Sequence, residues 1–134
     1  MRREYIAITV AITLAGCATS EPANPVLAPI YDEFIAEVAE DGPENFFDFF
    51  TLASFRSDGD TLIGDLMLGA EGQAAYDADP AELQQDLWET FFYDDPCSDS
   101  FMGPILTNGG TIRYDVTSDT GRPLFSFQSP TCKE

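Results

Sequence analysis

Two runs of β-forming residues flank the dipeptide Asp58-Gly59. A two-residue hairpin turn requires positive φ at both central positions, and Asp-Gly is one of the pairs that adopt this conformation readily. The pattern therefore predicts that residues 51–57 and 60–68 form an antiparallel pair. One face of the second strand is apolar, because Leu62, Leu66 and Leu68 recur with the two-residue period of a strand.

A helix is predicted to begin at Asp79-Pro80-Ala81-Glu82. Asp caps a helix well, Pro suits the first helical position, and a Glu three residues after the cap completes a capping box. The apolar residues that follow have helical spacing and form one stripe. These residues are Leu83, Leu87, Trp88, Phe91 and Phe92.

The order of the predicted elements indicates an α+β fold. Apolar residues recur at every fourth position from Ile30 and predict a helix that ends at Asp41-Gly42-Pro43. Residues 111–117 alternate cleanly and residues 124–128 return after a turn, which predicts a second hairpin. The order helix, hairpin, helix, hairpin predicts an antiparallel sheet of about four strands with two to three helices packed on one face.

Residues 46–50, just before the first hairpin, contain four phenylalanines. Such a run is either buried against the sheet or exposed as a patch that binds a partner. Trp88 is a further large aromatic side chain on the predicted second helix. The candidate partner-binding residues are therefore Phe46, Phe47, Phe49, Phe50 and Trp88, with burial in the core as the alternative.

The first sixteen residues have the pattern of a secretory signal. A positive start at Met1-Arg2-Arg3 precedes an apolar run from Tyr5 to Leu14 and small residues before Cys17. The apolar run is shorter than the stretch of about 20 residues that a membrane-spanning helix needs. The sequence thus predicts a signal over residues 1–16, a Pro-rich tether over 17–29 and a single domain over 30–134.

The stretch Leu14-Ala15-Gly16-Cys17 resembles the lipobox of bacterial lipoproteins. In that family a lipid is attached to the Cys thiol, and the chain is then cut before this residue. The resemblance implies that Cys17 is lipidated and that its acyl chains hold the protein permanently on a membrane. By the same resemblance, Ala18 favours the outer membrane, facing the periplasm. An ordinary cleaved signal that carries a Cys is the alternative.

Lipidation of Cys17 would leave two cysteines, Cys97 and Cys132. An even number of cysteines in an exported chain predicts one disulfide. This bond would close a loop of about 35 residues and hold the end of the chain in place. A metal-binding or redox pair is the alternative, although the sequence contains neither His nor a Cys-x-x-Cys motif.

The chain is strongly acidic, with 24 Asp and Glu against 6 Lys and Arg and a formal charge of −18. Such a charge argues against nucleic acid and a flat anionic membrane surface as partners. Three explanations for the acidic composition remain: solubility in a salty setting, a basic partner and a bound cation. The acids Asp94, Asp95 and Asp99 lack the spacing of a calcium loop. We therefore expect no metal site and no cofactor.

Catalytic groups are scarce in the sequence. The absence of His removes the usual general base and makes a Ser-His-Asp triad impossible. Carboxylates are abundant, but most fall on predicted outer faces, whereas a glycosidase needs two of them across a cleft. We therefore expect a protein without enzymatic activity.

Residues 50–132 resemble small exported α+β domains with one disulfide, among them pilotin lipoproteins of the AspS type. The matching positions are Leu52, Gly59, Leu66, Met67, Leu68, Cys97, Gly110, Tyr114, Gly121, Leu124 and Cys132. Pilotins escort secretin subunits to the outer membrane. The resemblance implies a lipid-anchored envelope protein that binds or escorts another envelope protein, in a groove between helix and sheet that fits an amphipathic helix. A structural or small-ligand-carrying lipoprotein, with an enclosed pocket, is the alternative.

Overall fold

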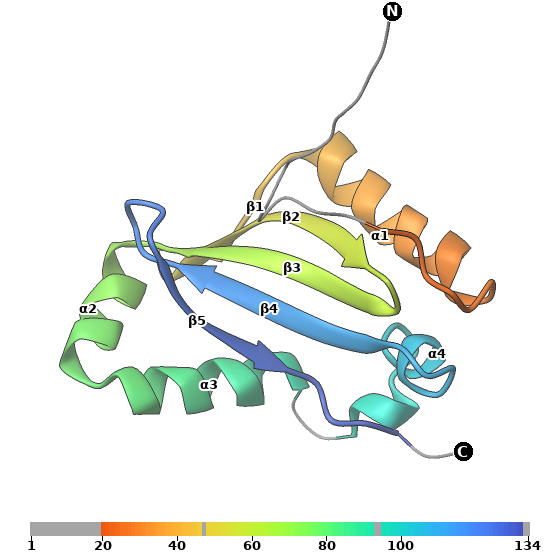
Figure 1. Ribbon diagram of the computed structural model, residues 1–134. Helices are drawn as coiled ribbons and strands as arrows, with labels where there is room; N and C mark the ends of the chain where they lie inside the picture. Colours follow the sequence, from red (N-terminus) through yellow and green to blue (C-terminus); the bar gives the residue numbers. More distant parts are fainter. Residues whose placement is uncertain (1–19, 47, 93–94, 133–134) are drawn as a thin grey trace, which may run out of the picture.

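A five-stranded sheet forms the centre of the fold, and its strands lie side by side in sequence order (Figure 1). The computed structural model describes residues 20–46, 48–92 and 95–132. The strands are β1 (Glu44–Phe46), β2 (Phe50–Asp58), β3 (Thr61–Leu68), β4 (Thr111–Thr117) and β5 (Pro123–Gln128). The helices are α1 (Leu27–Asp41), α2 (Ala70–Ala78), α3 (Pro80–Phe92), the 3-10 helix η2 (Pro96–Ser98) and α4 (Gly103–Leu106).

The sheet is mixed, so the expectation of about four antiparallel strands is wrong. Both predicted hairpins form, as β2 with β3 and β4 with β5. The strands β3 and β4, however, are parallel neighbours, with Thr61 opposite Thr111 and Met67 opposite Thr117. The chain between them passes through α2, α3, η2 and α4, and such a long crossover returns it to the end of the sheet where β3 began. The fifth strand, β1, comes from the phenylalanine-rich segment and pairs with β2.

Local sequence signals account for the two longest helices. The carboxylate of Asp79 accepts a hydrogen bond from the amide of Glu82 at 3.2 Å, as expected of a cap before α3. Helix α1 ends before Gly42, whose φ of 84° suits glycine. The prediction missed α2 and α4, because neither has a clear apolar stripe. Within the described residues, no helix is long and apolar enough to span a membrane.

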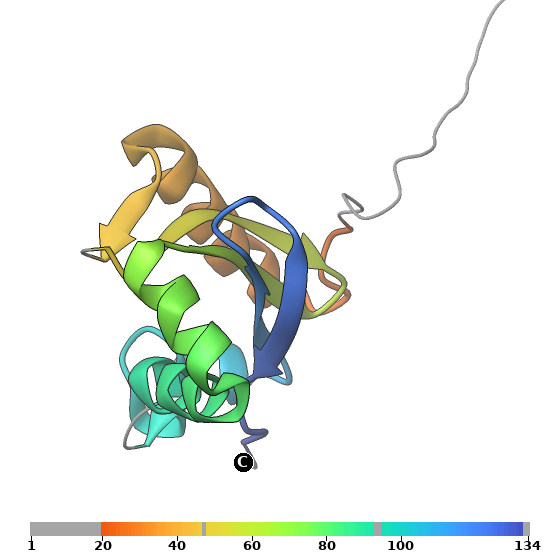
Figure 2. The same cartoon turned by 90° about the vertical axis from the view of Figure 1, so that its left-hand side faces the viewer.

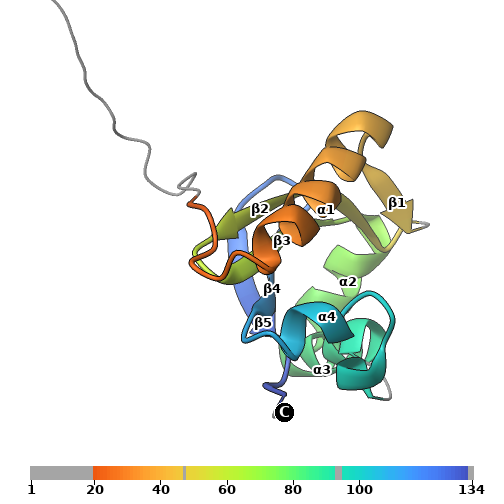
Figure 3. The same cartoon turned by 90° about the vertical axis from the view of Figure 1, so that its right-hand side faces the viewer.

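All the helices lie on one face of the sheet, as predicted, and the other face is open (Figures 2 and 3). Along β4 the side chains of Ile112, Tyr114 and Val116 are buried, whereas the residues between them are half-buried. The buried side chains pack against Leu27 and Tyr31 of α1 and against residues of α3 and α4 in one core cluster. This alternation places the polar residues of β4, among them Arg113 and Asp115, on the open face.

A β-bulge in β2 decides which of its residues face the helices. The register shifts between Leu52 and Ser54, so that Leu52 lies opposite Leu66 and Phe55 lies opposite Gly64. Leu66 and Gly64 are two residues apart on β3 and therefore share a face. Because of the bulge, Leu52 and Phe55 share this face too, although they are three residues apart in the sequence.

The segment before α1 is bound to the β2–β3 hairpin. The amide of Ser20 donates to the carbonyl of Ser57 at 2.9 Å, and the hydroxyl of Ser57 donates to the carbonyl of Ser20 at 2.9 Å. The carboxylate of Asp60 accepts from the amide of Ala23 at 2.9 Å. The side chain of Asn24 donates to the carbonyl of Asn108 at 2.8 Å. Residues 20–24 therefore have a fixed position at the hairpin end of the sheet.

The disulfide between Cys97 and Cys132 is formed, as predicted from the cysteine count. It joins η2 to the segment that follows β5, with the two Cα atoms 5.9 Å apart. The bond therefore holds the end of the described chain next to the loop that leads into α4.

Candidate functional site

An apolar hollow opens between α1 and the α3–α4 side of the molecule, over β2, β3 and β4. Its volume is about 280 Å³. We call it the aromatic groove. Its lining residues are Phe34, Phe55, Leu62, Phe91, Asp99, Phe101, Met102, Ile112 and Tyr114.

A chain of aromatic rings crosses the aromatic groove from one wall to the other. The ring of Phe34 on α1 lies 5.5 Å from that of Phe55 on β2, in an edge-to-face arrangement. Phe55 in turn lies 6.3 Å from Tyr114 on β4, and Tyr114 lies 4.2 Å from Phe91 on α3. The first two distances are favourable for ring pairs and the third pair is in close contact, so the rings form a continuous apolar surface.

Gly64 of β3 makes room for this surface. A Cβ atom at this position would lie 2.6 Å from Cε1 of Tyr114 and 3.0 Å from Cε1 of Phe55. Since glycine has no side chain, both rings can lie directly against the backbone of β3. The bulge in β2 contributes as well, because it brings Phe55 opposite Gly64.

The most exposed large apolar side chain of the described residues lies at this groove. Phe101 is 70% exposed, compared with 49% for Val26 and 39% for Met67 elsewhere on the surface. The neighbouring Tyr114 is buried, and burial raises the pKa of its hydroxyl. No side chain or backbone group of the described residues forms a hydrogen bond with this hydroxyl. An exposed aromatic ring beside an aromatic hollow is typical of a surface that binds an apolar partner.

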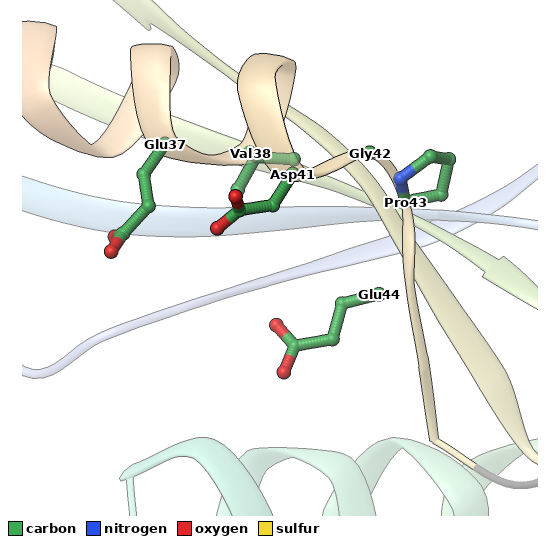
Figure 4. Close-up of a pocket in the computed structure, with 6 residues that line it drawn as sticks. All are labelled: Glu37, Val38, Asp41, Gly42, Pro43 and Glu44. Atoms are coloured by element: carbon green, nitrogen blue, oxygen red, sulfur yellow. The ribbon is translucent and has the colours of Figure 1, made fainter.

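An acidic hollow of about 390 Å³ lies at the C-terminal end of α1. In Figure 4 the carboxylates of Glu37, Asp41 and Glu44 point into the space beneath α1, and Val38, Gly42 and Pro43 complete the lining. Across the described parts of the chain, no three His, Cys, Asp or Glu side chains come together in a group that could hold a metal ion. We call the hollow lined by Glu37, Asp41 and Glu44 the acidic hollow.

The open face of the sheet carries an ion-pair network around Asp115. Arg56 binds both Asp115, at 2.8 Å, and Asp65, at 3.2 Å, and Arg113 binds Asp115 at 2.9 Å. Partial burial opposes ionisation of Asp115, but the hydrogen bonds from Arg113 and Ser126 and the charges of both arginines outweigh it and lower its pKa. A general acid at neutral pH needs a raised pKa, so Asp115 is poorly suited to acid catalysis.

The described residues that the sequence suggested for partner binding, Phe46, Phe49, Phe50 and Trp88, are not among those that line the aromatic groove. Phe50 is buried in the core, and Phe46 and Phe49 are half-buried against it. The indole Nε1 of Trp88 donates to the carbonyl of Gln128 at 3.0 Å. Phe50 contacts the groove only through Phe91, whose ring lies 5.5 Å away. Cys17 and Phe47 lie outside the described residues.

Sequence reasoning missed most residues of the aromatic groove. They come from five helices and strands and from the connector before α4, and the apolar ones among them have the spacing of ordinary core residues. Phe101 follows Ser98, Asp99 and Ser100 in the connector after Cys97, but Met102 comes directly after it, so no sequence signal separated it from core residues.

Two solved structures share this fold. One is a candidate secreted protein from Pseudomonas aeruginosa, with a TM-score of 0.60 and 17% identity over 78% of this chain and 89% of that chain. The other is the pilotin EpsS of the Vibrio vulnificus type 2 secretion system, with a TM-score of 0.54 and 15% identity over 78% of this chain and 86% of that chain. No protein-family profile and no curated protein matches the sequence. At these identities the similarity shows a common fold.

Proposed function

We propose that this protein is a non-catalytic, lipid-anchored envelope protein that binds and escorts another envelope protein, in the manner of a pilotin. Lipid on Cys17 would attach it to the outer membrane facing the periplasm. The aromatic groove would hold an apolar helical segment of the partner. The observation that carries this proposal is the exposure of Phe101 beside a continuous aromatic surface.

The shape of the groove supports a helix as the bound element. Helix α1 and the α3–α4 side form two walls, and the strands between them form the floor. An amphipathic helix laid in such a groove can bury its apolar stripe against the rings, while its polar face stays in water. The fold that the chain shares with a pilotin agrees with this role.

The alternative functions fit the described residues less well. A carrier of small ligands needs a cavity that encloses most of its ligand, whereas the aromatic groove is open beside Phe101. An enzyme needs converging polar groups with suitable pKa values, whereas the paired carboxylates Asp65 and Asp115 are both bound to Arg56.

Site-specific photo-crosslinking in cells tests the groove. A photoreactive phenylalanine analogue replaces Phe101 in one variant and, as a control, Met67 in another, because Met67 is exposed on the open face. We expect one discrete adduct from position 101 only, and mass spectrometry should locate the crosslink in an amphipathic segment of an envelope protein. Equal adducts from both positions, or none from position 101, would contradict the proposal.

The lipid anchor has its own test. The variant Cys17→Ser should remain soluble or accumulate as a precursor, and it should not incorporate a labelled fatty acid. Wild-type mobility together with extraction only by detergent would show that Cys17 does not carry the anchor.

A further inference from the structure

The aromatic groove and the acidic hollow follow one another along α1. Phe34 lines the first hollow, and Glu37, Val38 and Asp41 line the second. Residues three, four and seven positions apart lie on one side of a helix, so the two hollows share the same side of α1. At about 1.5 Å per residue, Phe34 and Asp41 are roughly 10 Å apart along the axis, or about two helical turns.

The helix-covered side of the molecule is acidic around the two hollows. Helices α1 and α3 and residues 95–110 contain several Asp and Glu residues but no Lys or Arg. Arg56 and Arg113 lie on the open face instead, where both are ion-paired. Asp99 lines the aromatic groove itself. The C-terminal end of α1, next to Asp41 and Glu44, adds the negative end of a helix dipole.

We propose that the segment bound in the groove is a cationic amphipathic helix, with Lys or Arg about seven residues from its main aromatic or aliphatic anchor. The anchor would lie on the rings beside Phe34 and Phe101, and the cations would lie in the acidic hollow near Asp41. This inference rests on the proposed function and specifies the chemistry of the partner.

Charge complementarity is the physical argument for this partner. A neutral helix would cover Glu37, Asp41 and Glu44 without pairing with them, and the loss of hydration would weaken binding. An acidic helix, including a segment of a second copy of this acidic chain, would be repelled. A cationic helix is attracted to the acidic surface as it approaches, which speeds association. Once bound, its cations pair with the carboxylates of the acidic hollow.

Three synthetic helical peptides with one shared apolar stripe test the inference. They carry Lys, Gln or Glu at the position seven residues from the anchor and are titrated into the full chain with Cys17→Ser, which requires no detergent. At about 0.05 M salt we expect the Lys peptide to bind about tenfold more tightly than the Gln peptide, and the Glu peptide to bind most weakly. The differences should shrink at about 0.5 M salt, where the Debye length is only a few ångströms.

A pair of charge variants supplies the matched control. Glu37→Gln, Asp41→Asn and Glu44→Gln together should abolish most of the preference for Lys. Neutralising three exposed acids that line neither hollow, by Glu71→Gln, Asp77→Asn and Asp119→Asn, should leave it nearly intact. Circular dichroism checks that both variants fold like the parent chain.

The outcomes separate this inference from the function on which it rests. If all three peptides bind equally at both salt concentrations, the groove binds a helix and the inference about charge is wrong. If no peptide binds and the photoreactive analogue at position 101 gives no adduct in cells, the proposed function itself fails. If the chain is a dimer that Phe101→Ser converts to a monomer, the occupant is a second copy, and the cationic partner is ruled out.

Discussion

Removal of the disulfide should destabilise the protein without changing its native structure. The variant carries Cys97→Ser and Cys132→Ser and keeps Cys17. The loop around Cys97 has other contacts that hold it in place. The carboxylate of Asp99 accepts hydrogen bonds from the amides of Phe101 and Met102 at 2.8 and 2.9 Å, and the amide of Gly103 donates to the carbonyl of Asp99 at 2.8 Å. These bonds do not involve sulfur, so we expect the loop to persist.

The expected loss follows from the length of the closed loop. The two cysteines are 35 residues apart in the sequence. In the chain-entropy model, a cross-link over this separation removes freedom of the unfolded chain worth about 4 kcal/mol at 25 °C. A domain of this size has a free energy of unfolding on the order of 5–15 kcal/mol, so the variant stays folded but loses a large fraction of its stability. The melting temperature should fall by roughly 15 °C.

Urea unfolding followed by tryptophan fluorescence measures this loss directly. Trp88 is the only tryptophan in the chain, and its indole is bonded to Gln128 at the end of β5. It therefore reports on the packing of α3 against the edge of the sheet. The denaturant slope of the variant should also rise, because its unfolded chain is no longer cross-linked and exposes more surface. The wild type under reducing conditions should match the double variant, and Ser100→Ala should match the oxidised wild type.

Two results would refute this reasoning. A loss of less than about 1 kcal/mol would show that loop closure contributes little here. A change in the fluorescence of Trp88 before any urea is added would show that the bond shapes the native structure as well as the unfolded chain.

Three further predictions concern the groove floor and the buried tyrosines. Gly64→Ala should lower the free energy of unfolding by about 1–3 kcal/mol and weaken peptide binding, because the new Cβ would lie 2.6 Å from the ring of Tyr114; an unchanged urea midpoint would contradict this. Tyr31→Phe should lower the free energy of unfolding by about 1 kcal/mol, because the hydroxyl of Tyr31 donates to the carbonyl of Asp60 at 2.6 Å. An unchanged free energy of unfolding in urea would show that this hydrogen bond does not stabilise the protein. Burial raises the pKa of Tyr31 and Tyr114 above the ordinary value near 10, with the charge of Asp60 adding to the effect at Tyr31. Above pH 10 the unfolded chain therefore loses protons that the folded chain keeps, so stability is fully present below that pH and should fall above it, with a slope that approaches about 3 kcal/mol per pH unit for the two tyrosines together. Urea titrations across this range check the slope, which should halve in Tyr31→Phe, and a flat profile would refute the assignment.

Signals within a few residues of one another were sufficient for much of the secondary structure. Asp79 and Glu82 marked the start of α3. Asp58-Gly59 marked the hairpin of β2 and β3, although the turn itself lies one residue later, at Gly59-Asp60. Capping and turn formation depend on the side chain and backbone of neighbouring residues, so they can be predicted from the sequence alone. The cysteine count likewise predicted the pairing of Cys97 with Cys132.

The sheet topology and the groove depended on contacts between distant residues. Two hairpins separated by helices can be joined in parallel or antiparallel order, and the crossover through α2, α3 and α4 selected the parallel pairing of β3 with β4. The bulge in β2 turned Phe55 toward the helices, where Gly64 left room for its ring. In the described part of the phenylalanine-rich segment, Phe50 joined the core and Phe46 and Phe49 packed against it.

The sequence by itself determined that this chain is an acidic α+β domain with one disulfide, because composition, turn chemistry and apolar periodicity act locally. Only the tertiary structure decided that rings from α1, β2, β4 and α3 meet in one open groove beside Phe101. It also decided that Glu37 and Asp41 continue this groove as an acidic hollow. The physical reason is that a binding surface consists of side chains that are far apart in the chain, and packing alone determines which of them become neighbours.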